Sequence, residues 1–212
     1  MKIAPSMLSS DFSRLKEEVE RLEISGADYI HLDVMDGVFV PNLTFGSPIV
    51  SSIRKFTKLP FDVHLMILEP HRYINEFVES GADIITFHVE AESRIKDTID
   101  LIKSHGKKVG LALKPGTDVT KLYGFLKYID LVLIMTVEPG FGGQRFIKKM
   151  MEKVKTLKEK IDNENLDVKI EVDGGINEDT AKIAKSCGVD IAVSGTSVFK
   201  SKDLKKAIEN LK

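Results

Sequence analysis

The chain has 212 residues, of which 42% are hydrophobic and 30% are charged, with 31 basic and 32 acidic side chains. This length is enough to bury one sizeable core, so we expect a single domain over residues 1–212. The formal net charge of -1 gives no reason to expect nucleic acid or a membrane surface as a partner. One cysteine, Cys187, excludes an intrachain disulfide and fits a reducing compartment. Because no apolar run approaches the roughly 20 residues that span a bilayer, and no signal-peptide pattern opens the chain, we expect a cytoplasmic protein.

Apolar segments typical of strands alternate with amphipathic segments typical of helices along the whole chain. The expected strands cover residues 2–8, 28–34, 61–66, 83–89, 108–113, 131–137, 168–173 and 191–194. The expected helices cover residues 12–25, 47–56, 70–80, 93–105, 119–126, 145–161, 178–187 and 204–211. Three boundaries between a helix and the next strand share a pattern in which glycine ends the helix: Ser-Gly-Ala-Asp at 25–28 and 80–83, and Cys-Gly-Val-Asp at 187–190.

Eight strand–helix units in one series predict a parallel sheet, because each parallel neighbour needs a crossover helix. Eight strands also close a (β/α)8 barrel, so the expected fold is α/β, a single (β/α)8 TIM barrel. An open, doubly wound sheet is the structural alternative. Such a sheet usually has fewer strands and a glycine fingerprint after its first strand, where this chain has Ser9, Ser10 and Asp11.

Two histidines and two aspartates lie at or near the ends of three expected strands. His31 and Asp33 are two residues apart on the second strand, so their side chains face the same side. His64 lies on the third strand, and Asp173 closes the seventh. A barrel gathers its chemistry at the carboxyl ends of its strands, so we expect these side chains to converge on one divalent metal ion rather than to serve as separate structural residues. Two imidazole nitrogens and two carboxylate oxygens suit Zn2+, Fe2+ or Mn2+.

Asp33 and Asp173 also suit proton transfer at a carbon beside a carbonyl. The second and seventh strands are three steps apart in an eight-strand ring, so the two carboxylates approach the axis from directions roughly 135° apart. One carboxylate can then remove a proton from one face of the carbon while the other returns a proton to the opposite face. The metal would stabilise the negative charge of the enediolate that forms between these two steps.

Other side chains share the inward direction of this cluster. Ser6 joins it from the first strand. His88, at the end of the fourth strand, either supports the metal ligands or has no part in the site, while Asp62 and Glu171 lie one layer lower, paired or hydrogen-bonded. Three methionines reach the rim of the same mouth, either as ordinary packing or as an apolar wall that keeps water off the reactive carbon: Met35, Met66 and Met135.

Glycine-rich loops follow the last three strands. They are Gly140-Phe141-Gly142-Gly143, Gly174-Gly175 and Gly195-Thr196. Glycine lets backbone N–H groups approach an anion closely, and barrels often hold a phosphate after strands seven and eight. Turns need glycine in any case, but three such loops in succession favour a phosphate site. The loop 139–144 is also expected to close over the substrate as a lid.

Five segments resemble ribulose-phosphate 3-epimerases in residue identity and in order. They are APSML at 4–8, HLDVMDGVFVPN at 31–42, DVHLM at 62–66, MTVEPGFGGQ at 135–144 and EVDGGI at 171–176. The similarity runs from Lys2 to about Phe199, and the second and fourth of these segments are long and highly specific.

The resemblance implies a metal-dependent isomerase of the pentose phosphate pathway that interconverts D-ribulose 5-phosphate and D-xylulose 5-phosphate. It implies that His31, Asp33, His64 and Asp173 bind the metal, with Asp33 and Asp173 also acting as acid and base. Because members of the family are commonly oligomeric, we expect a homo-oligomer. The implied contacts with the sugar phosphate are Ser6, His64, Gly140, Phe141, Gly142, Gly143, Asp173, Gly174, Gly175, Gly195 and Thr196.

Three other functions compete with this interpretation. A D-allulose 6-phosphate 3-epimerase would share the barrel, metal and chemistry, but such enzymes tend to have serine where this chain has Gly175. A decarboxylase or aldol-type lyase on a related barrel would carry Asp-x-Lys, where this chain has Asp33, Val34 and Met35. A non-catalytic phosphosugar-binding protein would have no need of two opposed acids.

Overall fold

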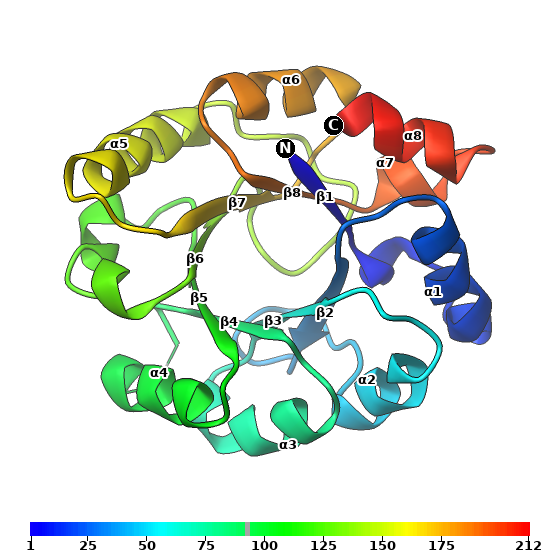
Figure 1. The fold of residues 1–212 in the computed structure, drawn as a ribbon, viewed down its shortest axis with the longest axis horizontal. Coiled ribbons are helices and arrows are strands. Elements are labelled where there is room, and N and C mark those ends of the chain that lie inside the picture. Colours follow the sequence, from blue (N-terminus) through cyan, green and yellow to red (C-terminus); the bar gives the residue numbers. More distant parts are fainter. Residues whose placement is uncertain (92–93) are drawn as a thin grey trace.

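A computed structural model describes residues 1–91 and 94–212. Its strands form a ring with the helices outside it, as Figure 1 shows. All strand pairs are parallel, in the order β1-β8-β7-β6-β5-β4-β3-β2. The strands are β1 (Lys2–Pro5), β2 (Ile30–Met35), β3 (Phe61–Met66), β4 (Ile84–His88), β5 (Lys108–Leu113), β6 (Leu131–Met135), β7 (Lys169–Asp173) and β8 (Ile191–Ser194). The expected (β/α)8 barrel is confirmed.

The ring closes between β1 and β2 through sparse contacts. A single parallel bridge joins Ser6 to His31, and the backbone N–H of Asp28 donates to the carbonyl of Ile3 at 3.0 Å. The closing bridge therefore involves two residues that the sequence already assigned to the site.

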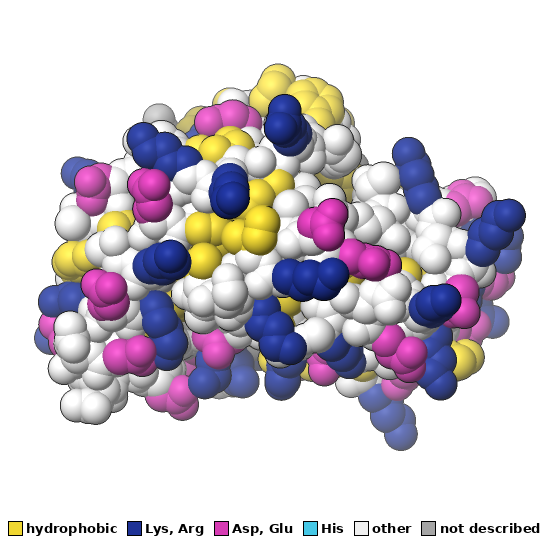
Figure 2. Space-filling model, turned by 90° about the horizontal axis from the view of Figure 1, so that it is seen from above, with side chains coloured by type: hydrophobic (Ala, Val, Ile, Leu, Met, Phe, Trp, Pro, Cys, Tyr) yellow, Lys and Arg dark blue, Asp and Glu magenta, His cyan; other side chains and the backbone are white. Residues whose placement is uncertain are grey.

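Eight α-helices surround the described part of the barrel. They are α1 (Leu15–Ile24), α2 (Ser47–Arg54), α3 (Ile74–Glu79), α4 (Ile95–Ser104), α5 (Met150–Asn163), α6 (Glu178–Ser186), α7 (Thr196–Phe199) and α8 (Leu204–Leu211). None of the helices in the described ranges is long and apolar enough to cross a membrane. Basic and acidic side chains are interspersed over the face seen in Figure 2, in keeping with their nearly equal numbers, 31 and 32.

Two expected helices need correction, two others begin with the 3-10 turns Phe12–Arg14 and Pro70–Tyr73, and one helix was missed. Residues 119–126 form no α-helix but the 3-10 turns Val119–Leu122 and Leu126–Tyr128, because Gly124 lies between them and glycine disfavours helix. Helix α5 begins at Met150 rather than at 145, since the N–H of Ile147 donates to the carbonyl of Thr136 and holds the preceding residues as a loop. The expected start of the fourth helix at 93 lies outside the described residues. The missed helix is α7, whose four residues are too few to show a helical period in the sequence.

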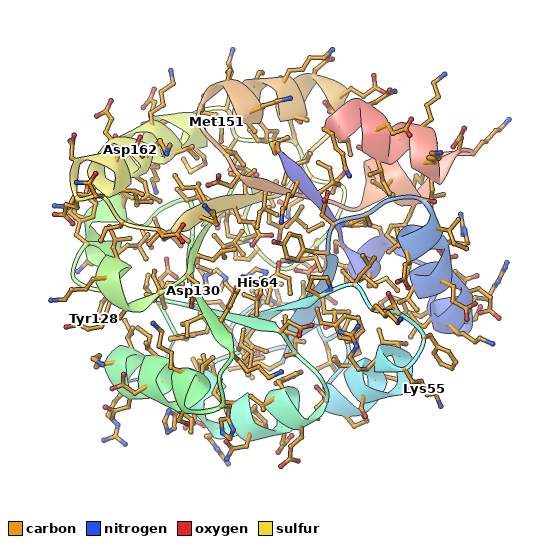
Figure 3. The ribbon with its side chains drawn as sticks, viewed as in Figure 1. Lys55, His64, Tyr128, Asp130, Met151 and Asp162 are labelled. Carbon is orange, nitrogen blue, oxygen red and sulfur yellow. The ribbon has the colours of Figure 1, made fainter. Side chains whose placement is uncertain are left out.

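The barrel interior is divided into an apolar and a polar part. Inward side chains of β1, β5, β6 and β8 are apolar, whereas β2, β3 and β7 contribute histidines and carboxylates. In Figure 3, His64 lies near the centre of the ring, while Asp162 lies on the outer helix α5 and Lys55 lies just after α2. The polar part carries the candidate site.

Four aspartates join strands in pairs at the opposite end of the barrel. Each precedes an even-numbered strand, and one carboxylate oxygen accepts the N–H of a residue in the preceding odd-numbered strand. The backbone N–H of the same aspartate donates to the carbonyl of that residue. The pairs are Asp28 with Ile3, Asp83 with Phe61, Asp130 with Val109 and Asp190 with Ile170, at 2.8 to 2.9 Å for the carboxylates. Three of these aspartates end the repeated glycine-containing boundary, so that pattern marks a structural contact.

Candidate active site

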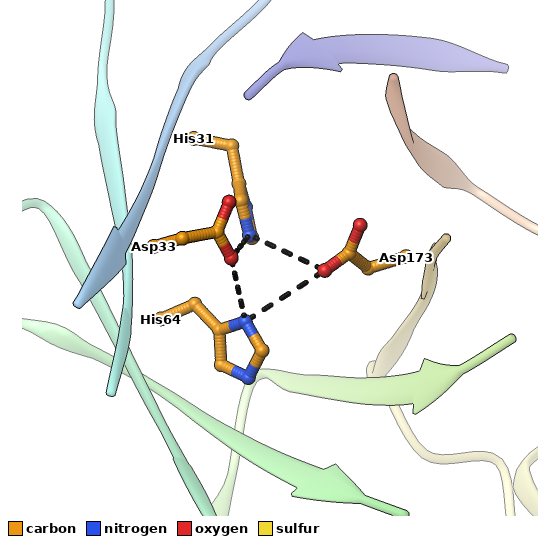
Figure 4. A group of neighbouring side chains, drawn as sticks. All are labelled: His31, Asp33, His64 and Asp173. Atoms are coloured by element: carbon orange, nitrogen blue, oxygen red, sulfur yellow. Dashed lines mark hydrogen bonds and ion pairs between the residues drawn. The ribbon is translucent and has the colours of Figure 1, made fainter. Parts of the chain in front are cut away.

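The four expected metal ligands converge in the barrel, although they come from separate strands. In the pairing of β2 with β3, Asp33 lies opposite His64 and His31 lies opposite Asp62. Asp173 ends β7 and approaches from the other side of the cluster, as Figure 4 shows. The imidazoles of His31 and His64 are fully buried, and 16% of the Asp173 side chain remains exposed.

Two imidazole nitrogens face two carboxylate oxygens in this cluster. Nδ1 of His64 lies 3.2 Å from Oδ1 of Asp33 and 3.8 Å from Oδ2 of Asp173. Nε2 of His31 lies 3.4 Å and 4.0 Å from the same two oxygens. One donor atom from each of the four residues lies within 4.8 Å of the others.

This donor set fits a divalent metal ion. Nε2 of His31 is buried, and among the described residues it has no hydrogen-bond partner. An unpartnered buried nitrogen is costly unless another group satisfies it. A cation at the centre of the cluster would satisfy this nitrogen and both carboxylates, and two histidines with two carboxylates form a common donor set for such ions.

The electrostatic surroundings of the two aspartates differ. Burial raises the pKa of Asp33, but the charge of His31 and the close approach of both imidazoles outweigh it and hold that pKa well below its usual range. Burial and the charge of Asp33 raise the pKa of Asp173 to about 7. Burial lowers the pKa of His31, but Asp33 and Asp62 outweigh it, and the net shift is strongly upward. A cation bound by this cluster would replace the protons that the raised pKa values of Asp173 and His31 favour.

Groups beneath and beside the four candidate ligands hold them in place. Nδ1 of His31 lies 2.7 Å from Oδ2 of Asp62. Asp62, which was expected to be paired or hydrogen-bonded one layer below the site, therefore forms its hydrogen bond with the candidate ligand His31. The hydroxyl of Ser6 donates to Oδ2 of Asp33 at 2.5 Å. Burial and the charge of Asp62 raise the pKa of Glu171 well above its usual range, which favours the neutral acid. Carboxylates that hold a ligating imidazole fix its orientation and proton position.

A cavity of about 240 Å³ opens above the carboxylates. The three methionines of the expected wall, Met35, Met66 and Met135, line it, as do Ser6, Asp33 and Asp173. All three glycine-rich loops line it too, through Gly140, Phe141, Gly142, Gly143, Gly174, Gly175, Gly195 and Thr196. His31 and His64 are not among the residues that line this cavity, and His64 lies instead with the other three candidate metal-binding residues.

Close packing explains two of the glycines in the cavity wall. A Cβ on Gly174 would lie 2.4 Å from a methyl group of Val137, and one on Gly175 would lie 2.5 Å from the backbone nitrogen of Phe146. Both residues also have positive φ, 121° and 68°. The strand-seven loop can therefore take this path only without side chains at these positions.

The loop 139–144 is held at its edges and exposed at its tip. The side-chain amide of Asn42 donates to the carbonyl of Gly140 at 2.7 Å, and Gln144 donates to the carbonyls of Glu138 and Phe141. Phe141 is 54% exposed. The loop thus contacts the β2–α2 connection while its aromatic side chain is half exposed; its closure over a substrate remains a prediction.

Several cavity residues were not expected from the sequence. Leu8, Ser9, Gln144, Asn177 and Val193 also line the cavity. Leu8, Ser9, Gln144 and Asn177 follow the ends of strands and Val193 lies on β8, and these positions are the signal that could have identified them.

The comparisons with known proteins agree with one another. The model of the Ribulose-phosphate 3 epimerase family matches residues 2–199. The ribulose-phosphate 3-epimerase of Bacillus subtilis (strain 168) is 48% identical over 213 residues, which cover 100% of this chain and 98% of that protein. The enzyme of the same name from Treponema pallidum (strain Nichols) is 48% identical over 197 residues, 93% of this chain and 90% of its own.

A solved structure supports the fold alone. A variant of the tryptophan synthase α-subunit from Pyrococcus furiosus superposes with a TM-score of 0.75 at 15% sequence identity, covering 99% of this chain and 97% of that one.

Proposed function

The chain belongs to the ribulose-phosphate 3-epimerase family, and on that premise we propose that it interconverts D-ribulose 5-phosphate and D-xylulose 5-phosphate by inverting C3. The observation that carries the proposal is the pair of carboxylates, Asp33 and Asp173, which reach the floor of one cavity from opposed sides. Inversion needs a proton acceptor on one face of C3 and a proton donor on the other.

Each aspartate has a defined part in this reaction. Asp33, which accepts a hydrogen bond from Ser6 and lies 3.2 Å from Nδ1 of His64, takes the C3 proton from one face of the substrate. Asp173, which keeps part of its side chain open to the cavity, returns a proton to the other face, and the reverse reaction exchanges these parts. Between the two steps the substrate is an enediolate.

A divalent ion held by His31, Asp33, His64 and Asp173 would supply the positive charge that lowers the barrier to forming the enediolate. The three methionines that line the cavity exclude water from C3, so the proton exchanges between substrate and carboxylates. The donor set admits Zn2+, Fe2+ and Mn2+.

The phosphate group is proposed to lie against the three glycine-rich loops. Gly143, Gly175 and Gly195 line the same cavity as the carboxylates, at the position where barrels often bind phosphate. In this proposal, C3 lies over the aspartates and the phosphate lies at the wall formed by these loops.

The proposal is tested with chelated protein and with protein restored with Zn2+, Fe2+ or Mn2+ in turn. Each preparation is given D-ribulose 5-phosphate and, separately, D-allulose 6-phosphate, and epimer formation is followed by NMR. We expect metal-dependent epimerisation of the pentose phosphate. Turnover of the hexose phosphate alone would identify the competing epimerase, and binding without turnover of either would contradict an enzymatic role.

A further inference from the structure

His88 is a fully buried histidine in direct contact with a proposed metal ligand. It ends β4, and its Nε2 lies 2.9 Å from Nε2 of His64. The two rings are nearly stacked, with centroids 5.0 Å apart and 29° between their planes. Two ring nitrogens at this distance share one hydrogen bond, so one donates a proton and the other accepts it.

The direction of this hydrogen bond follows from the opposite side of His64. Its Nδ1 faces the carboxylates of Asp33 and Asp173, where a metal ion needs a free lone pair. A neutral imidazole that keeps Nδ1 free carries its proton on Nε2. His64 must then donate to Nε2 of His88, which accepts.

The direction of the hydrogen bond from His64 to His88 also sets the direction of the next one, from His88 to Glu90. Because Nε2 of His88 accepts, His88 carries its own proton on Nδ1, which lies 3.2 Å from Oε2 of Glu90. The other oxygen of Glu90 accepts the backbone N–H of Lys114 at 2.8 Å, which anchors the carboxylate. On the far side, the ring of Phe39 packs against His88 at 5.0 Å between centroids.

His64 needs such a partner because its surroundings favour the wrong tautomer. Two carboxylate oxygens lie within 3.2 and 3.8 Å of Nδ1 and attract a proton there. A proton on Nδ1 would block the metal. His31 has a simpler arrangement, since Asp62 accepts a hydrogen bond from its Nδ1 at 2.7 Å, which leaves Nε2 without a proton and free for the metal.

We propose that His88 and Glu90 are positioning residues that draw the proton of His64 to Nε2 and so keep its Nδ1 free for the metal ion. The proposal rests on the metal site of the proposed function. It extends that site by two residues, neither of which touches the substrate cavity or the metal position.

The test combines two measurements on the full-length protein. Long-range proton–nitrogen NMR of 15N-histidine-labelled, chelated protein reports which nitrogen of His64 is protonated. Competition with a chromophoric chelator gives the Kd for Zn2+ alone.

The variants are His88→Leu, which removes the acceptor, His88→Gln, whose side-chain oxygen restores it, and Glu90→Gln. Thr86→Val is the matched control, since Thr86 lies two residues earlier on the same face of β4 and its hydroxyl has no partner among the described residues.

We expect the His64 proton on Nε2 in wild type and on Nδ1 in His88→Leu, with Zn2+ binding about 10- to 100-fold weaker in that variant. The Kd of His88→Gln and of Thr86→Val for Zn2+ should lie within about threefold of the wild-type value. The Kd of Glu90→Gln should lie between those of wild type and His88→Leu. Circular dichroism checks that each variant is folded, and recovery in His88→Gln separates the lost acceptor from lost packing.

The outcomes separate this proposal from the proposed function. Equally tight Zn2+ binding by wild type and His88→Leu, or a wild-type His64 protonated on Nδ1, would overturn the role of His88 and leave the metal site standing. A wild-type protein without Zn2+ affinity would overturn the metal site and, with it, this proposal.

Discussion

Asp33 and Asp173 are the same residue type in one cluster, yet their surroundings give them different properties. Asp33 accepts a hydrogen bond from Ser6 and lies against both imidazoles, whereas Asp173 is partly open to the cavity. The asymmetry suits a reaction in which one carboxylate starts as base and the other as acid.

Replacing either aspartate with asparagine removes a proton carrier while keeping the side-chain shape. We expect Asp33→Asn and Asp173→Asn each to lower kcat by at least about 10³-fold, because general acid–base catalysis contributes on that scale and each residue is also a metal ligand. A coupled epimerase assay measures kcat, and thermal melts confirm that the fold is retained. Activity above a tenth of wild type in either variant would contradict the assignment of two proton carriers.

Gly175 gives a second prediction at the residue scale. With φ of 68° and a would-be Cβ 2.5 Å from the nitrogen of Phe146, Gly175→Ala should lower the free energy of unfolding by about 1 to 3 kcal/mol. The displaced loop should also raise KM for the sugar phosphate. Gly116→Ala is the control, since nothing lies within 4 Å of its would-be Cβ. Urea unfolding and steady-state kinetics measure the two effects, and equal behaviour of both variants would refute the packing argument.

At the scale of elements, the connections after the strands carry the functional groups, and Asp36 shapes the one after β2. Its carboxylate accepts the backbone N–H groups of Val38, Phe39 and Leu68, each at 2.8 Å. It therefore joins the β2–α2 connection to the residues that follow β3, and it is a turn residue rather than a catalyst.

This carboxylate should make stability depend on pH. Burial raises the pKa of Asp36, but the three backbone N–H groups outweigh it and lower the pKa below 3.8. An acid with a depressed pKa in the folded state stabilises the protein above its unfolded pKa and loses that contribution as the pH falls through the folded value.

We expect Asp36→Asn to lower the free energy of unfolding by about 1 to 3 kcal/mol at pH 7, by analogy with other hydrogen bonds to charged groups. The difference from wild type should narrow as the pH falls below 3.8. Urea titrations across this range measure it, with Asp167→Asn at a 94% exposed carboxylate as the control. A difference that stays constant with pH would show that the charge of Asp36 has no part in it.

At the scale of the whole molecule, the two ends of the barrel have different tasks. The candidate site lies at the carboxyl ends of the strands, and the four aspartates that join strands in pairs lie at the other end. Stability and chemistry can therefore change independently.

Asp190→Ala tests this division. The variant loses the acceptor for the N–H of Ile170, so the free energy of unfolding should fall by about 1 to 3 kcal/mol. Its kcat, assayed well below the melting temperature, should match wild type. A large drop in kcat with unchanged stability would show that the two ends are coupled.

Much of this architecture could be predicted from the sequence. Eight alternating units and glycine-terminated helices determine the barrel, and residue parity on β2 and β3 brings His31, Asp33 and His64 together. The 3-10 turns after β5 could not be predicted, because their apolar spacing imitates a helix. The contact between His64 and His88 also needed the structure, since parity shows that His88 points inward but not which nitrogen it presents.

The central claim is that two opposed carboxylates transfer protons at C3. The most direct test follows the first turnover of D-ribulose 5-phosphate in deuterated water with metal-restored protein, measuring deuterium at C3 of both product and remaining substrate. Two carriers predict a product with deuterium at C3 from the outset, while recovered substrate keeps its protium. A product that retains the original proton at C3 would show that a single group carries it from one face to the other, and would contradict the account.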